Sequence, residues 1–266
     1  MKTVVITGVT GTLGVALAQE YKNQGWKVVG VTRRGDWTHP AVDEVLALAQ
    51  DGEADAKAML ACAPDVVLLN AGQIESEVGE MGEPLLEQVE SMNRVNYSFP
   101  ATVAMVASEM AWEKRVDIVA IGSIADGSPS AFGPAYHATK AAIHYFVTGV
   151  GPILNYASPN LRLRLYRPGV IYGPLSWSPI LRLNERGYKV RAARCNKAPQ
   201  PDVVAKRVVD WVAGDGWVGS DPEPLSFRFL KLLYGLFPNG FYKLQILGWK
   251  KASRYASQDP APTKEG

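Results

Sequence analysis

Short aliphatic runs alternate along most of the chain with longer stretches in which apolar residues recur at helical spacing. The runs are rich in Leu and β-branched residues and mostly apolar on both faces, which is typical of strands buried in a parallel sheet. They predict strands at Thr3–Thr7, Lys27–Thr32, Val45–Gln50, Asp65–Asn70, Val116–Gly122 and Leu161–Arg167. Helical spacing predicts helices over Leu13–Asn23, Ala54–Cys62, Leu85–Met110, Tyr136–Gly149 and Asp202–Ala213. This alternation indicates an α/β fold, with a doubly wound parallel sheet between two layers of helices.

The sequence shows no division into several domains. No internal repeat and no linker rich in Pro, Gly or Ser interrupts it, so residues 1–257 are expected to form one domain. Between the second and third strands only Gly35–Glu44 is available, and Pro40 lies within it, so we expect a stunted or missing helix there. The tail, residues 258–266, contains Pro260 and Pro262 and is expected to be flexible.

Charge and cysteine content narrow the possible classes of protein. Among 266 residues, 28 Lys and Arg stand against 26 Asp and Glu, so the net charge of +2 gives no reason to expect a nucleic acid partner. The two cysteines match no zinc or redox spacing, which favours a reducing compartment, and we expect no metal site. The first aliphatic run is shorter than the apolar segment of a signal peptide, and no run approaches the roughly 20 apolar residues of a membrane span. We therefore expect a cytoplasmic protein.

A glycine-rich turn directly follows the first strand and opens the first helix. Glycine allows a tight turn there, close approach of the backbone to a pyrophosphate, and packing of the helix on the strand. The N-terminus of the helix also offers free N–H groups and the positive end of its dipole to phosphates. Because the turn joins a strand to a helix within a βαβ pattern, it predicts a dinucleotide site. The residues of this turn are Gly8, Thr10, Gly11, Thr12, Leu13 and Gly14.

The end of the second strand indicates which dinucleotide binds. It reads Thr32, Arg33 and Arg34, with no acidic residue to hold the 2′-hydroxyl of an adenosine ribose. A guanidinium here can clamp a 2′-phosphate, which favours NADP(H) over NAD(H), although either arginine could instead be a solvated surface charge. Asp51, just past the third strand, either faces the adenine or begins the next helix as a cap.

Tyr136 and Lys140 lie four residues apart, on one face of a predicted helix. A phenol with a pKa near 10 is a poor general acid–base at neutral pH, and a nearby cation favours its ionised form. Ser123 ends the fifth strand, thirteen residues before Tyr136, and Asn70-Ala71-Gly72 ends the fourth strand.

Together these motifs resemble the short-chain dehydrogenase/reductase family over roughly residues 1–215. That family carries, in order, a glycine-rich turn, an Asn-Ala-Gly turn, an asparagine in a Val-Asn pair, a serine, a Tyr-x-x-x-Lys pair and a Pro-Gly turn. After the glycines, this chain supplies Asn70-Ala71-Gly72, Val95-Asn96, Ser123, Tyr136 with Lys140, and Pro168-Gly169. Six matches in the right order are far more specific than any one of them.

The resemblance implies a Rossmann fold and an oxidoreductase (EC 1.1.1.-) that moves a hydride between a nicotinamide and a small carbonyl or alcohol substrate. It implies that Tyr136 exchanges a proton with the substrate oxygen and that Ser123 hydrogen-bonds that oxygen. Lys140 would lower the pKa of the phenol and hold the nicotinamide ribose, while Asn96 would position a relay water. Cofactor contacts are implied for the glycine turn, Thr32, Arg33, Arg34, Asp51, Asn70, Ala71, Gly72, Tyr136, Lys140, Pro168, Gly169 and Val170. A homo-oligomer, dimer or tetramer, is also implied.

The motifs mix two branches of the family. The spacing of Gly8, Gly11 and Gly14 matches the extended branch, which includes nucleotide-sugar epimerases and dehydratases, whereas the residues around Tyr136 match the classical branch. A nucleotide-sugar-modifying enzyme is therefore one alternative function, and a non-catalytic protein that senses dinucleotides is another. The complete set of Asn, Ser, Tyr and Lys argues against the sensor, because binding alone needs no phenol beside the nicotinamide.

Residues 175–199 follow the sixth strand, where the family places a substrate lid. This segment contains Trp177 and several aliphatic residues, which suit an apolar substrate. It also contains Arg182, Arg186, Arg191 and Arg194, any of which suits an anionic substrate, and ordinary helix packing with a solvated basic face is an equal alternative.

The C-terminal part of the domain, residues 225–255, predicts two amphipathic helices. The first has an apolar stripe of Phe229, Leu232, Leu233, Leu236 and Phe237, and the second combines aromatic and basic residues. Such a pair can lie on an anionic bilayer, as a peripheral membrane contact. We favour the simpler interpretation, in which the helices cover the sheet or pack against another subunit.

Overall fold

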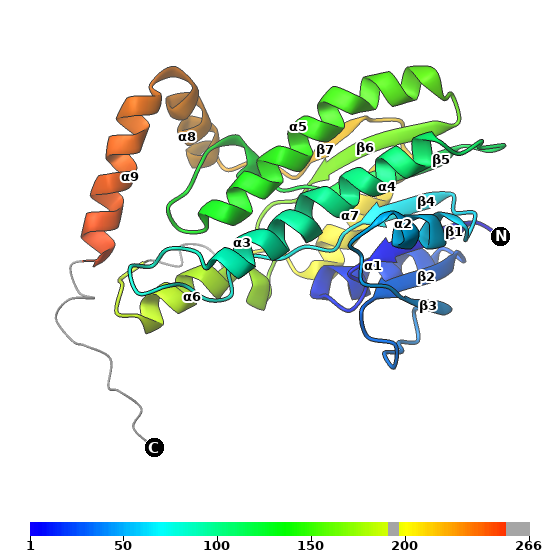
Figure 1. The fold of residues 1–266 in the computed structure, drawn as a ribbon, viewed down its shortest axis with the longest axis horizontal. Coiled ribbons are helices and arrows are strands. Elements are labelled where there is room, and N and C mark those ends of the chain that lie inside the picture. The colour runs from blue at the N-terminus through cyan, green and yellow to red at the C-terminus, as the bar shows by residue number, and fades with distance from the viewer. Residues whose placement is uncertain (191–196, 254–266) are drawn as a thin grey trace.

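The structure is a computed structural model that describes residues 1–190 and 197–253. Its centre is a seven-stranded parallel sheet with the order β3-β2-β1-β4-β5-β6-β7, flanked by helices on both faces (Figure 1). This arrangement confirms the predicted doubly wound α/β fold of three layers. The strand order reverses between β1 and β4, which is where open sheets of this kind bind their ligands.

The seven strands form the central layer of the molecule. They are β1 (Thr3–Thr7), β2 (Lys27–Thr32), β3 (Glu44–Ala47), β4 (Val66–Leu69), β5 (Val116–Ile121), β6 (Leu161–Arg167) and β7 (Val218–Ser220). The bounds predicted from the sequence hold for β1, β2 and β6. The predicted third strand is too long at its end, because Gln50 has a left-handed φ of 61° and donates its N–H to Asp55 at 2.7 Å.

The helices are α1 (Thr12–Asn23), α2 (Glu53–Leu60), α3 (Leu86–Asn93), α4 (Phe99–Ser108), α5 (Pro134–Ala157), α6 (Ser178–Glu185), α7 (Pro201–Ala213), α8 (Leu225–Leu236) and α9 (Pro238–Ser253). Short helical turns are η1 (Arg94–Ser98), η2 (Ile124–Gly127) and η3 (Pro174–Trp177). Residues 33–43, between β2 and β3, contain no helix, as predicted. Within the described ranges, no helix is long and apolar enough to cross a bilayer.

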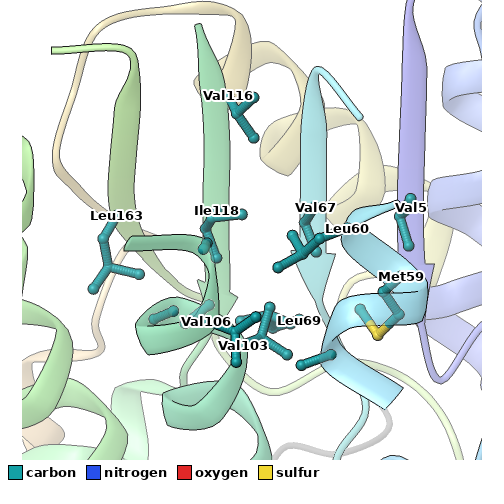
Figure 2. Close-up of a cluster of buried hydrophobic side chains, with 14 of the residues drawn as sticks. Val5, Met59, Leu60, Val67, Leu69, Val103, Val106, Val116, Ile118 and Leu163 are labelled. Carbon is teal, nitrogen blue, oxygen red and sulfur yellow. The ribbon is translucent and has the colours of Figure 1, made fainter. Parts of the chain in front are cut away.

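Successive side chains of each strand point to opposite faces of the sheet, so a separate apolar core forms on each face. Val5, Val67 and Ile118 face α2, α4 and α5, where Met59 and Val103 pack over them (Figure 2). The residues between them point the other way, toward α1 and α7. Burial of each large side chain stabilises the fold by roughly 1.5–3 kcal/mol, so both faces hold the sheet in place.

The long helix predicted at Leu85–Met110 forms as three joined pieces. α3 and α4 are separated by η1, a π-helical turn, and Asn96 lies within it. Pro100 has no N–H to donate to the carbonyl of Asn96, four residues earlier, so the regular α-helical pattern is broken at that point. Turns of this kind are frequent at functional sites.

The end predicted for the next helix, Gly149, is wrong, because α5 continues to Ala157. Packing on the sheet explains the extension. A Cβ on Gly151 would lie 3.3 Å from the carbonyl oxygen of Leu163 in β6, so glycine lets helix and strand approach closely. Leu154, one turn later, is buried in the same core.

The sheet also contains β7, which the sequence did not indicate because it is only three residues long. β7 pairs in parallel with β6, and the connection between them is held by Arg164. This guanidinium is fully buried, forms an ion pair with Asp117 at 2.9 Å, and donates to the carbonyls of Trp211 and Val212 at the end of α7. An arginine inside β6 therefore serves as a structural cap for the C-terminus of α7, the helix that precedes β7.

The two C-terminal helices form a hairpin that stands to one side of the three layers (Figure 1). Of the two arrangements favoured from the sequence, covering of the sheet is wrong, and packing against another subunit stays a prediction. No residue of α8 is buried, and Phe229, Leu232, Leu236 and Phe237 of the predicted stripe are all exposed. The tail predicted to be flexible lies outside the described residues.

Candidate active site

The turn after β1 contains three glycines, so few side chains cover the backbone at the start of α1. Gly8 has a left-handed φ of 63°, and a Cβ there would lie 2.7 Å from the Cα of Ala71. A Cβ on Gly14 would collide with the carbonyl oxygen of Gly8. Gly11 is the N-cap of α1, and no side chain caps the helix. The first N–H groups of α1 are therefore free to receive a phosphate.

Asn70 ties this turn to the one that follows β4. Its side-chain amide donates to the carbonyl of Thr7 at 3.1 Å, and the backbone N–H of Ala71 donates to the hydroxyl of Thr7 at 2.9 Å. The two turns meet at the point where the strand order reverses. These bonds fix one side of the cavity that opens there.

An open cavity of about 990 Å³ runs along the carboxyl ends of the strands. It is lined by most of the residues that the sequence singled out, and its volume suits a dinucleotide together with a small substrate. Those residues are Gly8, Thr10, Gly11, Thr12, Leu13, Gly14, Thr32, Arg33, Arg34, Asn70, Ala71, Gly72, Ser123, Tyr136, Lys140, Pro168 and Gly169.

Three predicted site residues do not line the cavity. Asn96 is buried behind it, and Val170 is exposed while its neighbour Ile171 lines the wall. Asp51 is exposed, and Gln50 takes its place in the lining. The alternative that Asp51 caps the next helix is wrong, because the N-cap of α2 is Gly52.

Two arginines stand at the end of β2. Arg33 and Arg34 are exposed at the rim of the cavity, and the N–H of Arg34 donates to the hydroxyl of Thr32 at 3.1 Å. Among the described residues, neither guanidinium pairs with a carboxylate. This end of the cavity therefore carries uncompensated positive charge.

Tyr136 and Ser123 come from α5 and the end of β5. Burial raises the pKa of the Tyr136 phenol, while a hydrogen bond with Ser123 acts in the opposite direction. The hydroxyl of Ser123 also accepts the N–H of Ala125 at 3.1 Å, which fixes its position. Two hydroxyl groups are thus held together inside the cavity, where they can both contact one substrate oxygen.

Lys140 lies one helical turn beyond Tyr136 and is buried. Its ammonium donates to the carbonyl of Ile121 at 2.9 Å and lies 5.8 Å from the centre of the Tyr136 ring. Burial lowers the pKa of Lys140 to about 8. Gly72 lies beside this ammonium, and a Cβ there would lie 3.7 Å from it, an ordinary van der Waals distance.

Asn96 holds the loop after β4 from behind the cavity. Its side-chain oxygen accepts the N–H of Gln73 at 2.8 Å, and its amide donates to the carbonyl of Gln73 and to the hydroxyl of Thr139, both at 2.9 Å. Thr139 precedes Lys140 on α5. Asn96 thus connects the π-helical turn η1 with the helix that carries Tyr136 and Lys140.

Sequence reasoning missed Glu75. Its carboxylate is buried and accepts the N–H groups of Ala135 at 2.8 Å and Tyr136 at 3.1 Å, at the start of α5. Its second oxygen is buried without a hydrogen-bond partner among the described residues. Nothing in the local sequence marked this residue, because the helix that it caps is far along the chain.

The lid region contributes less than predicted. Leu175, Ser176 and Ser178 line the cavity, whereas Trp177 does not. Arg182 faces away, since it donates to the carbonyl of Ser76 and pairs with Glu185 at 2.7 Å. The predicted contacts Arg191 and Arg194 lie outside the described residues.

Comparison with known proteins places this geometry in context. A family model described as short chain dehydrogenase matches residues 2–178. Serine 3-dehydrogenase of Rhizobium radiobacter is 23% identical over 242 residues, which cover 87% of this chain and 93% of that protein. NADP-dependent 3-hydroxy acid dehydrogenase YdfG of Shigella flexneri is 25% identical over 243 residues, covering 86% of this chain and 94% of that protein.

Solved structures share the fold. A short chain dehydrogenase from Burkholderia cenocepacia in complex with NADP superposes with a TM-score of 0.71 at 15% identity, covering 92% of this chain and 99% of that one. A short-chain dehydrogenase from Sphingobium yanoikuyae in complex with NADPH gives a TM-score of 0.69 at 18% identity, covering 91% of this chain and 96% of that one. The relatives are dehydrogenases by name, so the alternatives of a nucleotide-sugar enzyme and a dinucleotide sensor are not favoured.

Proposed function

This chain belongs to the short chain dehydrogenase family and is an oxidoreductase that moves a hydride between a nicotinamide dinucleotide and a carbonyl or alcohol; we propose that it is an NADP(H)-dependent carbonyl reductase. The observation that carries the proposal is that two groups of residues, one for the cofactor and one for catalysis, line the same cavity. The bare glycine turn lies in its wall, and so do Ser123, Tyr136 and Lys140. A protein that only bound the dinucleotide would need the first group alone.

In this proposal Tyr136 passes its phenolic proton to the substrate oxygen during reduction and takes it back during oxidation. Ser123 donates a hydrogen bond to the same oxygen as negative charge develops on it. The bound nicotinamide supplies or accepts the hydride. The raised pKa of the phenol keeps Tyr136 protonated at neutral pH, which suits the direction of reduction.

Lys140 and Asn96 support that proton transfer. The buried ammonium of Lys140 stabilises a phenolate one helical turn away, and its N–H groups suit the hydroxyls of a ribose. Asn96 has its side chain committed to Gln73 and Thr139, so its part in a relay would fall to its backbone carbonyl, which Pro100 leaves without the usual helical donor. A water held there could pass a proton to Lys140.

The residues present fit a phosphorylated dinucleotide. A Cβ would fill the cradle at Gly8 and Gly14, so the backbone can approach a pyrophosphate. Arg33 and Arg34 supply unpaired positive charge for a 2′-phosphate. Support also comes from the relative named as NADP-dependent and from the similar structures that contain NADP or NADPH.

Among the possible substrates, an uncharged one agrees best with the described residues that line the cavity. Apart from Arg33 and Arg34 at the end of β2, Lys140 is the only basic residue among the described residues that line the cavity. The wall formed by α3 and η1 presents Glu87, Gln88, Ser91, Met92 and Val95, which include no basic side chain. A substrate carboxylate would have no arginine partner there, so we place neutral aldehydes and ketones ahead of the 3-hydroxy acids and serine that appear in the names of the relatives.

We also propose a homo-oligomer in a reducing compartment, the cytoplasm. Large side chains remain exposed on the outer helices, among them Met105 of α4 and Tyr145, Ile153 and Tyr156 of α5. A self-complementary contact between these helices would cover them. The free thiol of Cys62 agrees with a reducing environment.

The proposal is tested by NADPH consumption with a panel of neutral aldehydes and ketones and of nucleotide sugars, and by NADPH formation from NADP+ with serine and 3-hydroxy acids. The Tyr136→Phe variant provides the matched control, because it loses the transferable proton and keeps the ring. We expect kcat to fall at least about 100-fold in this variant, with nearly unchanged affinity for NADPH. A wild-type kcat in Tyr136→Phe would overturn the mechanism, and turnover of nucleotide sugars alone would overturn the substrate class.

A further inference from the structure

The helix α8 presents an apolar stripe to the outside of the molecule. Leu225, Phe229, Leu232 and Leu236 follow one another at helical spacing on one face. Their exposed fractions are 80%, 62%, 59% and 61%, whereas the apolar stripe of an ordinary surface helix faces the core. Phe237, at the bend into α9, is exposed as well.

The second helix of the hairpin extends this apolar surface. Tyr242, Leu244, Ile246 and Leu247 are exposed along α9. Together with the stripe of α8 they make up the exposed apolar side chains of the hairpin, which we call the hairpin surface. Monomeric soluble proteins rarely leave so many such side chains together in water, so a partner covers the hairpin surface.

All charged side chains of the hairpin are basic. From Pro224 to Ser253 the sequence contains no Asp or Glu. The basic residues of the same stretch are Arg228, Lys231, Lys243, Lys250 and Lys251. All of them except Lys231 are exposed, and Lys231 is engaged with Glu223 at 2.7 Å. The partner must therefore accept both apolar side chains and a cluster of positive charge.

The hairpin is held firmly against the rest of the chain. Tyr234 of α8 and Phe241 of α9 are in ring contact at 5.4 Å. Trp249 packs between Phe132 and Tyr188, with ring centres at 5.7 and 5.2 Å. The side of α9 that carries Phe241 and Trp249 is thus occupied by contacts within the chain, which hold the hairpin in place.

We propose that the hairpin surface docks this enzyme on an anionic lipid bilayer, with α8 and α9 lying in the plane of the interface. The apolar stripe of α8 and Phe237 would enter the acyl boundary, while Lys243, Lys250 and Lys251 would contact lipid phosphates. A second copy of the chain is the less suitable partner. A self-complementary contact would set this basic surface against itself, and like charges facing each other oppose association.

The test is co-sedimentation of the full chain with vesicles of phosphatidylcholine, with and without phosphatidylglycerol, at low and high salt. We expect binding to the anionic vesicles only, weakened by salt. The double variant Leu236→Asp, Phe237→Asp should lower the apparent affinity about 100-fold or more, since each large apolar side chain contributes about 10-fold or more. The double variant Lys243→Glu, Lys250→Glu should lower it about 25-fold or more, at about 5-fold for each lost positive charge.

Matched controls separate the hairpin surface from general effects. Lys57→Glu with Lys206→Glu changes the net charge equally on α2 and α7, and Val203→Asp places a carboxylate on another exposed apolar position. Both controls should bind as the natural protein does. If the Leu236 and Phe237 pair prevents folding, Leu225→Ser with Phe229→Ser replaces it.

Two results would overturn the proposal. One is a folded natural protein that does not sediment with anionic vesicles at low salt. The other is equal binding by the natural protein and the Leu236→Asp, Phe237→Asp variant. A change in oligomeric state caused by that variant, in a protein that binds no vesicles, would assign the hairpin surface to a second copy of the chain.

Discussion

Glu75 accepts a hydrogen bond at 3.1 Å from the backbone N–H of Tyr136, although 61 residues separate them in the sequence. The same carboxylate oxygen accepts the N–H of Ala135, so Glu75 caps the first turn of α5 from outside the helix. It also places a carboxylate near the phenol, and this charge contributes to raising the pKa of Tyr136. One side chain therefore affects both the position and the acidity of the proposed proton donor.

Glu75→Gln is expected to separate these two effects, because it keeps an acceptor for the helix and removes the charge. The pKa of Tyr136 should then fall, so the rate of alcohol oxidation should begin to rise at a lower pH than in the natural enzyme. Glu75→Ala should in addition lower the free energy of unfolding by about 1–3 kcal/mol, since buried N–H groups lose their acceptor. Full pH–rate profiles and urea denaturation measure the two effects. Glu87→Gln, an exposed carboxylate at the same cavity, should leave both unchanged.

Arg33→Ala is expected to weaken NADPH far more than NADH. Only NADPH carries the 2′-phosphate, and a charge-assisted hydrogen bond of roughly 1.5–3 kcal/mol corresponds to about a 10- to 150-fold change in affinity. Titration of both cofactors with the variant and with Arg34→Ala shows how the two guanidinium groups share the contact. Equal weakening of NADPH and NADH by Arg33→Ala would mean that this residue does not recognise the 2′-phosphate.

Much of the fold could be predicted because its signals are local. The strands β1, β2 and β6 have the predicted bounds; β1 and β2 are short runs rich in β-branched residues, and β6 alternates Leu with Arg and ends before Pro168. The glycines after β1, the turn at Asn70 and the pair Tyr136 and Lys140 are also local motifs. The topology of a parallel sheet then brings the carboxyl ends of its strands to one edge, and the cavity lies there.

The parts that could not be predicted depend on contacts between distant segments. Glu75 became part of the site through its contact with α5, and Arg164 became buried through the carbonyls at the end of α7. Gly151 continues a helix because β6 lies against it. The apolar stripe of α8 has the same helical spacing whether it faces the sheet or the outside of the molecule, so spacing alone could not decide between the two.

Lys140→Met is expected to change how stability depends on pH. Burial lowers the pKa of Lys140 to about 8, from an ordinary value of 10.5, so between these two pH values the unfolded chain holds more protons than the folded protein. The free energy of unfolding of the natural protein, relative to the Met variant, should therefore rise as the pH increases through this range. The free energy of unfolding of the natural protein relative to Lys140→Met should rise by roughly 3 kcal/mol in total, and it should be constant below about pH 7. Urea denaturation of both proteins at several pH values measures it, and a flat difference would show that Lys140 is not destabilised by burial.

A buried carboxylate gives the opposite dependence on pH. Asp126 in η2 is paired with Arg167 of β6 through two bonds of 2.6 Å and with His144 of α5 at 2.8 Å, and Lys231 of α8 lies 3.6 Å away. Burial would raise the pKa of Asp126, but the hydrogen bonds from His144 and Arg167 hold it below the usual value of 3.8. The cluster therefore joins the sheet, the helix of Tyr136 and the C-terminal hairpin through one charge.

Asp126→Asn is expected to lower the free energy of unfolding at neutral pH by about 3–5 kcal/mol, because it leaves buried positive charge with less compensation. The native carboxylate has a lower pKa folded than unfolded, so its contribution is fully present above about pH 4 and is lost as the pH falls further. The difference between the natural protein and the variant should therefore shrink on acidification. Asp210→Asn, which breaks only the exposed pair with Lys206, should cost less than about 1 kcal/mol. If the difference in free energy of unfolding between the natural protein and Asp126→Asn stays constant below pH 4, the pKa of Asp126 is not depressed. If Asp126→Asn and Asp210→Asn lower the free energy of unfolding equally, the cluster has no special structural role.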